Sequence, residues 1–115
     1  MKVTFYHNPR CTKSRETLAL LQAKGIAPEV IEYLKTPPTA AELDAILQKL
    51  GKEPRAAMRR QEPPYKELGL DGPALSREQL IKAMVENPVL IERPIVLANG
   101  KARIGRPPES VLEIL

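Results

Sequence analysis

The fold of this chain is decided by the stretch Tyr6-His7-Asn8-Pro9-Arg10-Cys11-Thr12-Lys13-Ser14. A β-branched and aromatic run over residues 3–6 leads into it and predicts a strand. Apolar residues at helical spacing follow it as far as Lys24-Gly25, where we expect the helix to end. Pro9 ends the strand. Cys11 is therefore predicted to lie in the connecting loop, at or just before the N-terminus of the helix.

That position favours a negatively charged thiolate at Cys11. Free backbone N–H groups and the helix dipole stabilise negative charge at a helix N-terminus, and Arg10 and Lys13 bring positive charge to the same place. We therefore predict a lowered pKa and a reactive thiolate. The alternative is a small buried apolar cysteine, but polar and charged neighbours in a loop are not typical of a core.

Length and composition restrict the class of protein. The chain has 115 residues, which predicts a single domain over 1–115 with a modest core. The net charge of +4 is spread along the chain and aromatic residues are few, which argues against nucleic-acid binding and fits a small anionic ligand better. Neither a signal region nor a stretch of membrane length is visible. We expect a cytoplasmic protein that does not bind membranes.

The single cysteine and the single histidine limit the chemistry further. An internal disulfide is impossible, so any redox reaction at Cys11 needs a second thiol from another molecule. One histidine and one cysteine cannot complete a metal site either, and we expect no bound metal.

The middle of the chain is predicted to be helical. A second strand is expected over residues 29–33, and residues 39–87 then show helical patterns only. Capping boxes start two helices, at Thr39 and at Ser76. The inner face of the second of these is expected to contain Leu80, Ile81, Met84 and Val85. A short helix is expected from Pro54, carrying Arg55, Met58, Arg59 and Arg60.

The C-terminal part predicts a β-hairpin and a last helix. Asn99-Gly100 between two strand-like runs is the strongest short hairpin signal, and it pairs Ala98 with Lys101. The same register pairs Leu97 with Ala102 and Ile95 with Ile104. Pro107-Pro108 then opens a helix, whose inner face is expected to contain Val111, Leu112 and Leu115.

Continued by two residues, the hairpin register places Arg93 opposite Arg106 at the open end of an apolar row. Like charges directly opposite each other destabilise a sheet. The pair is understandable if an anion binds between the two guanidinium groups. The alternative is that both arginine side chains are frayed and extend into water. The hairpin register alone does not decide between these two interpretations.

Taken together, these residues resemble a known family. The chain resembles the glutaredoxin-coupled arsenate reductases, the ArsC family, whose fold is thioredoxin-like, and within them a bacterial housekeeping subgroup. The resemblance covers essentially the whole chain. It rests on His7-Asn8-Pro9-x-Cys11-x-x-Ser14-Arg15, Tyr33-Leu34-x-Thr36-Pro37, Glu62-x-Pro64-Tyr65-x-Glu67-Leu68, Arg93-Pro94-Ile95-Val96 and Gly105-Arg106-Pro107.

The resemblance implies an α/β fold. It implies a mixed four-stranded sheet with flanking helices and a helical insertion, about 39–87, between strand 2 and the C-terminal hairpin. The family's nucleophilic cysteine falls on Cys11, and its three anion-binding arginines fall on Arg59, Arg93 and Arg106. Arg60 is adjacent to the first of these, and the motif favours Arg59. The Arg93-Pro94 bond is implied to be cis.

His7 and Ser14 are implied to activate the thiolate. His7 corresponds to a residue that helps to lower the pKa of the cysteine; the alternative is a surface or core histidine without a role in the reaction. Ser14 is a candidate hydrogen-bond donor to the thiolate. Alternatively, its side chain caps the N-terminus of the helix, and the two roles are compatible.

The implied activity is reduction of arsenate to arsenite. The resemblance implies glutathione as co-substrate, glutaredoxin as protein partner and no bound cofactor, and we expect a monomer. Two alternatives remain: a glutathione-dependent thiol oxidoreductase with another substrate, and a redox-linked transcription regulator that binds RNA polymerase. Ser14 stands where several such regulators have a second cysteine, which argues against the last one.

Overall fold

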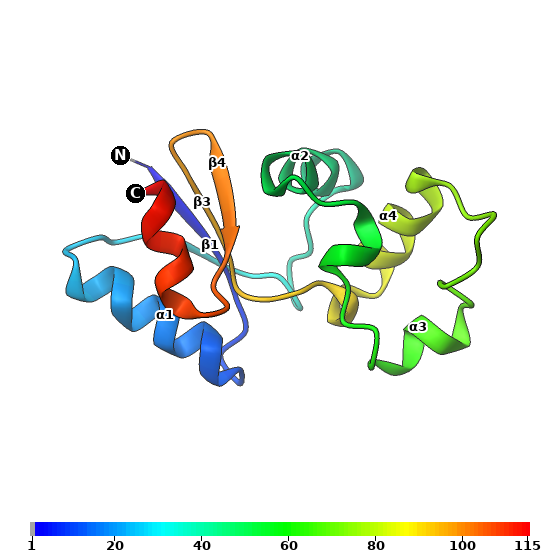
Figure 1. Cartoon of the computed structure of the whole chain (residues 1–115). Coiled ribbons are helices and arrows are strands. Elements are labelled where there is room, and N and C mark those ends of the chain that lie inside the picture. The colour runs from blue at the N-terminus through cyan, green and yellow to red at the C-terminus, as the bar shows by residue number, and fades with distance from the viewer. Residues whose placement is uncertain (1) are drawn as a thin grey trace. The chain divides into compact units, whose positions relative to one another are not determined.

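A computed structural model describes residues 2–115. They form two compact units: the first contains the residues up to Thr36 together with Arg93–Leu115, and the second contains Pro37–Glu92. The first unit is built from β1 (Val3–His7), α1 (Thr12–Ala23), β2 (Glu29–Glu32), β3 (Ile95–Ala98), β4 (Lys101–Ile104) and the 3-10 helix η3 (Pro108–Ile114) (Figure 1). The second is built from α2 (Ala40–Leu50), η1 (Pro54–Ala57), α3 (Pro63–Glu67), α4 (Arg77–Glu86) and η2 (Pro88–Leu90). The expectation of a single domain stays a prediction.

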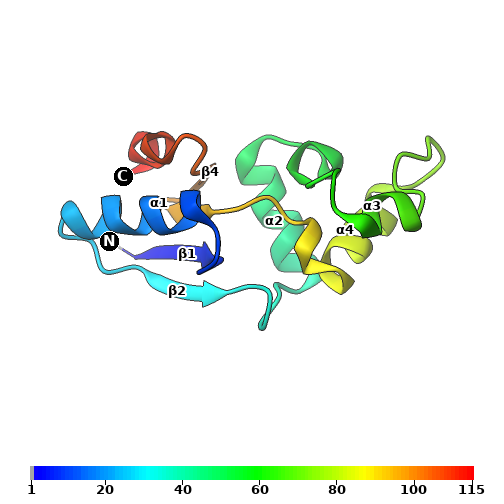
Figure 2. The same ribbon diagram turned by 90° about the horizontal axis from the view of Figure 1, so that it is seen from below.

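The sheet of the first unit has the strand order β2-β1-β3-β4. β1 pairs with β2 in parallel and with β3 antiparallel, and β3 pairs with β4 antiparallel. Helix α1 runs alongside β1 and contacts η3, which also contacts β4 (Figures 1 and 2). The predicted mixed four-stranded sheet with flanking helices is confirmed.

The predicted hairpin register is also confirmed. Ala98 lies opposite Lys101, and Ile95 lies opposite Ile104. Asn99 and Gly100 have φ angles of 54° and 73°, as a two-residue type I′ turn requires. The Asn99 amide donates a hydrogen bond of 2.8 Å to the carbonyl of Ile114, which attaches the turn to η3.

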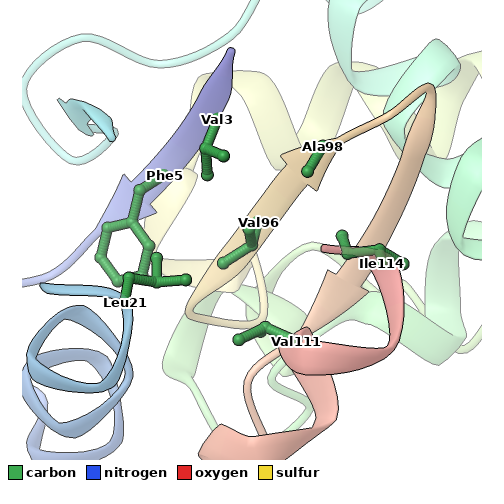
Figure 3. Packing of buried hydrophobic residues seen from close by; sticks show 7 residues of the cluster. All are labelled: Val3, Phe5, Leu21, Val96, Ala98, Val111 and Ile114. Carbon is green, nitrogen blue, oxygen red and sulfur yellow. The ribbon is translucent and has the colours of Figure 1, made fainter. Parts of the chain in front are cut away.

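The core of the first unit lies between the sheet and the pair α1 and η3. Figure 3 shows Phe5 of β1 next to Leu21 of α1, and Val96 of β3 near Val111 of η3. All four of these side chains are fully buried. Aliphatic side chains supply most of this core, and burying each Val, Leu or Ile side chain stabilises the unit by about 1.5–3 kcal/mol.

The second unit is helical apart from one isolated bridge. Both predicted capping boxes are present, at Thr39 and at Ser76, and Gly51 ends α2 in the left-handed conformation. On α4 the predicted inner residues Leu80, Ile81 and Met84 are buried, whereas Val85 is only half-buried and Ala83 is buried in its place.

One helix of the second unit is shorter than expected. The helix from Pro54 ends at Ala57, and Met58 instead forms a bridge with Ile91. Arg59 and Arg60 therefore follow this helix rather than lying on it. The Met58 N–H still donates to the carbonyl of Arg55 at 3.2 Å, so Met58 closes the last turn of this helix and also forms the bridge. Nothing in the sequence around Met58 indicates that this residue pairs with Ile91.

The last helix also differs from the expectation. Pro108–Ile114 is a 3-10 helix, which has three residues per turn and so brings every third side chain to one face. Pro108, Val111 and Ile114 are accordingly buried, while Leu112 and Leu115 are only half-buried. The prediction was right for Val111 and in part for Leu115, which is half-buried and packs against the core of the first unit. It was wrong for Leu112, because it assumed the α-helical period.

This face can be tested with two truncations. Ile114→Ala removes a buried side chain and should lower the free energy of unfolding by about 2–4 kcal/mol. Leu112→Ala, the matched control, should cost about 1 kcal/mol, because the Leu112 side chain is already partly exposed to water. Urea denaturation followed by circular dichroism measures both. An equal or larger effect of Leu112→Ala would contradict the 3-10 face and favour the α-helical face that the sequence predicts.

Candidate active site

Cys11 occupies the predicted place between β1 and α1. It is the N-cap residue of α1, with φ −92° and ψ 123°, and it is partly exposed. Its backbone N–H donates to the carbonyl of Asn8 at 3.0 Å, and its carbonyl accepts the N–H of Arg15 at 3.0 Å. The thiol therefore stands at the start of a helix, in a loop whose backbone is fixed.

Two side chains hold the loop in shape. The Asn8 side-chain oxygen accepts the N–H of Arg10 at 3.0 Å. The guanidinium of Arg15 donates to the carbonyl of Pro9 at 2.9 Å and approaches the hydroxyl of Thr12 at 3.4 Å. Arg15 belongs to the quoted motif, but its hydrogen bonds to the loop were not predicted, because a sequence does not show which carbonyl a side chain reaches.

The surroundings of Cys11 stabilise its charged form. Burial by itself raises the pKa of the thiol, but hydrogen bonding and charge outweigh it, and the pKa lies below its ordinary value. The Ser14 N–H contributes most to this lowering, followed by the Arg93 guanidinium, the Lys13 N–H and the Arg106 guanidinium. These are the free N–H groups of a helix start and the predicted arginine pair acting together.

The arginine pair lies at the open end of the hairpin, beside the thiol. Beyond the strands, the N–H of Gly105 donates to the carbonyl of Pro94 at 2.9 Å. Arg106 Nε donates to the carbonyl of Arg93 at 2.8 Å, and Arg106 Nη2 lies 3.6 Å from Cys11 Sγ. The two residues lie together as predicted. Arg106 is exposed, but its guanidinium is held at the Arg93 carbonyl and at the thiol.

The backbone around this pair has two special features. The Arg93-Pro94 bond is cis, as the resemblance implies, and the Arg106-Pro107 bond is cis as well, which was not predicted. Gly105 lies so close to α1 that an added Cβ would stand 2.6 Å from Thr17 Oγ1. A side chain at this position would push the hairpin end, and with it Arg106, away from the helix. The only signal in the sequence is a glycine directly before Arg106-Pro107.

His7 contacts the site through Ser14. The Ser14 hydroxyl is fully buried, lies 2.7 Å from His7 Nδ1 and accepts the N–H of Asn8 at 3.0 Å. Burial lowers the pKa of His7, against the charge of Glu32 and with that of Arg15. His7 is therefore neutral at neutral pH. Its influence on the pKa of Cys11 stays a prediction.

Arg59 and Arg60 belong to the second unit. The Arg59 N–H donates to the carbonyl of Leu90 at 2.7 Å, and its guanidinium pairs with Glu62 at 3.5 Å. Arg60 instead reaches back toward the carbonyl of Arg55 at 3.4 Å. The two arginines thus have different local partners, and the assignment of Arg59 to an anion site stays a prediction.

Residues 2–115 contain neither a candidate metal site nor a candidate membrane-spanning helix. No group of three or more His, Cys, Asp or Glu side chains there is arranged to hold a metal ion. Within the same residues, no helix has the length and apolar character needed to cross a membrane.

Comparison with known proteins identifies the family. The model of the ArsC family matches residues 6–114. The chain belongs to the ArsC family. It is 61% identical over 115 residues to the uncharacterized protein YfgD of Escherichia coli (strain K12), and the alignment covers 99% of this chain and 97% of that protein. It is 53% identical over 116 residues to the arsenate reductase of Haemophilus influenzae, over 100% of both chains.

A solved structure agrees with the family assignment. The arsenate reductase from Vibrio cholerae has 60% sequence identity and a TM-score of 0.97, over 100% of this chain and 98% of that chain. The thioredoxin-like α/β fold expected from the resemblance is thereby confirmed for this member of the ArsC family.

The electrostatic account of Cys11 predicts a pH effect. Arg106→Gln removes a positive charge beside the sulfur, so the pKa of Cys11 should rise and less thiolate should be present at neutral pH. The pH midpoint of Cys11 alkylation by iodoacetamide should move upward. Arg103→Gln is the matched control on the same hairpin, because Arg103 pairs with Glu113 at 3.5 Å and should leave the midpoint unchanged. Equal shifts in both variants would contradict the account.

Proposed function

We propose that the protein reduces arsenate to arsenite, with Cys11 as nucleophile and with glutathione and glutaredoxin as the reducing partners. The observation that carries the proposal is the arginine pair at the thiol: Arg106 Nη2 lies 3.6 Å from Cys11 Sγ, and Arg93 adds positive charge. A thiolate next to two guanidinium groups suits a tetrahedral oxyanion. The names of the relatives from Haemophilus influenzae and Vibrio cholerae support arsenate as that oxyanion.

In the first step the Cys11 thiolate attacks the arsenic atom. A sulfur–arsenic bond forms, and one arsenate oxygen leaves as water after protonation. Arg93 and Arg106 hold the remaining oxygens, because a planar guanidinium can donate two parallel hydrogen bonds to an oxyanion. The resemblance adds Arg59 as a third donor in this step. Preorganised donors of this kind stabilise the charge that develops on oxygen.

In the second step glutathione attacks the Cys11 sulfur. A sulfur–sulfur bond forms and the sulfur–arsenic bond breaks, so that its electron pair stays on arsenic. Arsenic(V) gains two electrons and leaves as arsenite, while two thiols become one mixed disulfide. Glutaredoxin then attacks the glutathione sulfur and releases the Cys11 thiolate.

The chain itself supports an external reductant. Cys11 is its only cysteine, and the helix position where a resolving thiol would fit carries Ser14. The Ser14 hydroxyl is engaged with His7 and the Asn8 N–H. A cytoplasmic location belongs to the same proposal, because the reaction consumes reduced thiols. The monomeric state stays a prediction.

A coupled assay tests the proposal. Arsenate, glutathione, glutaredoxin, glutathione reductase and NADPH are mixed with the protein, and NADPH consumption is followed. Cys11→Ser should show none, and Arg106→Lys should lower kcat by about 10²–10³-fold, because lysine cannot make the two-pronged contact. Arg103→Lys is the matched control and should stay close to wild type.

The outcomes separate the alternatives. Absence of arsenate-dependent NADPH consumption by the wild type would contradict the arsenate assignment. Activity of Cys11→Ser would contradict nucleophilic catalysis. Turnover of a mixed glutathione disulfide without any turnover of arsenate would favour a thiol oxidoreductase with another substrate.

A further inference from the structure

A cavity of about 270 Å³ lies next to the cysteine loop in the first unit. It is lined by residues 7–10, at and after the end of β1, and by Glu32, Leu34 and Lys35, at and after the end of β2. Neither Cys11 nor the arginine pair belongs to the lining. The cavity is thus a neighbour of the oxyanion site and uses different side chains.

The lining combines both signs of charge with apolar surface. Arg10 and Lys35 are positive, Glu32 is negative, and Leu34 is an exposed large apolar side chain, 42% exposed. Glu32 and Lys35 form an ion pair at 3.6 Å, but their side chains are 44% and 80% exposed. An ion pair so open to water contributes little, so a ligand can replace either partner at small cost.

We propose that this cavity binds the reducing thiol, as the subsite for glutathione. The inference rests on the proposed function, which requires an external thiol at Cys11. Glutathione has one ammonium group and two carboxylates, the reverse of the one carboxylate and two cations of the lining. Glu32 binds the ammonium group, Lys35 and Arg10 bind the carboxylates, and Leu34 and Pro9 cover the apolar part of the tripeptide.

The position of the cavity fits this role. Arg10 directly precedes Cys11, and the Cys11 N–H is bonded to the carbonyl of Asn8, another lining residue, at 3.0 Å. The wall of the cavity therefore continues into the backbone that carries the thiol. An extended tripeptide is about 10 Å long, which suffices for a ligand held at this wall to present its sulfur to the loop.

Thiol–disulfide exchange tests the subsite without arsenate. The Cys11 thiolate attacks oxidised glutathione, a new disulfide joins Cys11 to one glutathione, and the other leaves as a thiolate. The rate is measured by intact-protein mass spectrometry, with oxidised glutathione and with the uncharged 2-hydroxyethyl disulfide. A change in the intrinsic reactivity of Cys11 affects both rate constants, so it cancels in their ratio.

The chain offers a matched control pair. Arg103 and Glu113 also form an exposed ion pair, at 3.5 Å, with side chains 38% and 63% exposed, but neither lines the cavity. Lys35→Gln and Glu32→Gln should each lower the rate ratio about threefold, the value of one partly exposed ion pair. Arg103→Gln and Glu113→Gln should leave the rate ratio at the wild-type value.

Glu32→Gln is the decisive variant. Oxidised glutathione carries net negative charge, so general electrostatics predicts a faster reaction when a nearby carboxylate is removed. Recognition of the ammonium group predicts a slower one. A ratio that rises in Glu32→Gln, or that falls equally in Lys35→Gln and Arg103→Gln, would overturn the subsite. These outcomes do not depend on arsenate, so failure of the arsenate assay and failure of the subsite are distinguishable.

Discussion

Arg106 and Cys11 are 95 positions apart in the chain, yet the Arg106 guanidinium lies 3.6 Å from the Cys11 sulfur. This contact depends on the hairpin, because the type I′ turn fixes the register and the register determines which residues reach the open end. It depends also on Gly105, where any side chain would collide with Thr17 of α1. The sheet, the hairpin and the first helix together place positive charge at the thiol.

The charge of the thiolate is stabilised by backbone N–H groups at the start of α1 and by the guanidinium groups of Arg93 and Arg106. His7 is buried, has a lowered pKa and lies within hydrogen-bond distance of Ser14. Because His7 is neutral, the protein does not have to bury a further charge. The contact of His7 with Ser14 helps to fix the start of α1.

Features that follow from local chemistry were predictable from the sequence, and features that need the assembled structure were not. The caps at Thr39 and Ser76 and the place of Cys11 rest on neighbours within a few residues, so the sequence is sufficient. The 3-10 form of the segment ending at Ile114 was missed, since α- and 3-10 helices share start signals and differ in period. The closeness of Gly105 to α1 was missed because a glycine says nothing about what approaches it. The family resemblance, by contrast, supplied roles for residues that no local pattern explains.

The central claim is that Cys11 and the two arginines form one oxyanion site. The most direct measurement is the rate of Cys11 alkylation by neutral iodoacetamide, at fixed pH and ionic strength, as sulfate replaces chloride. A bound oxyanion places negative charge beside the sulfur, raises its pKa and covers it. The account predicts that alkylation of the wild type slows and reaches a plateau with sulfate, and that Arg106→Gln loses this response. Equal rates in sulfate and chloride for the wild type would contradict the claim.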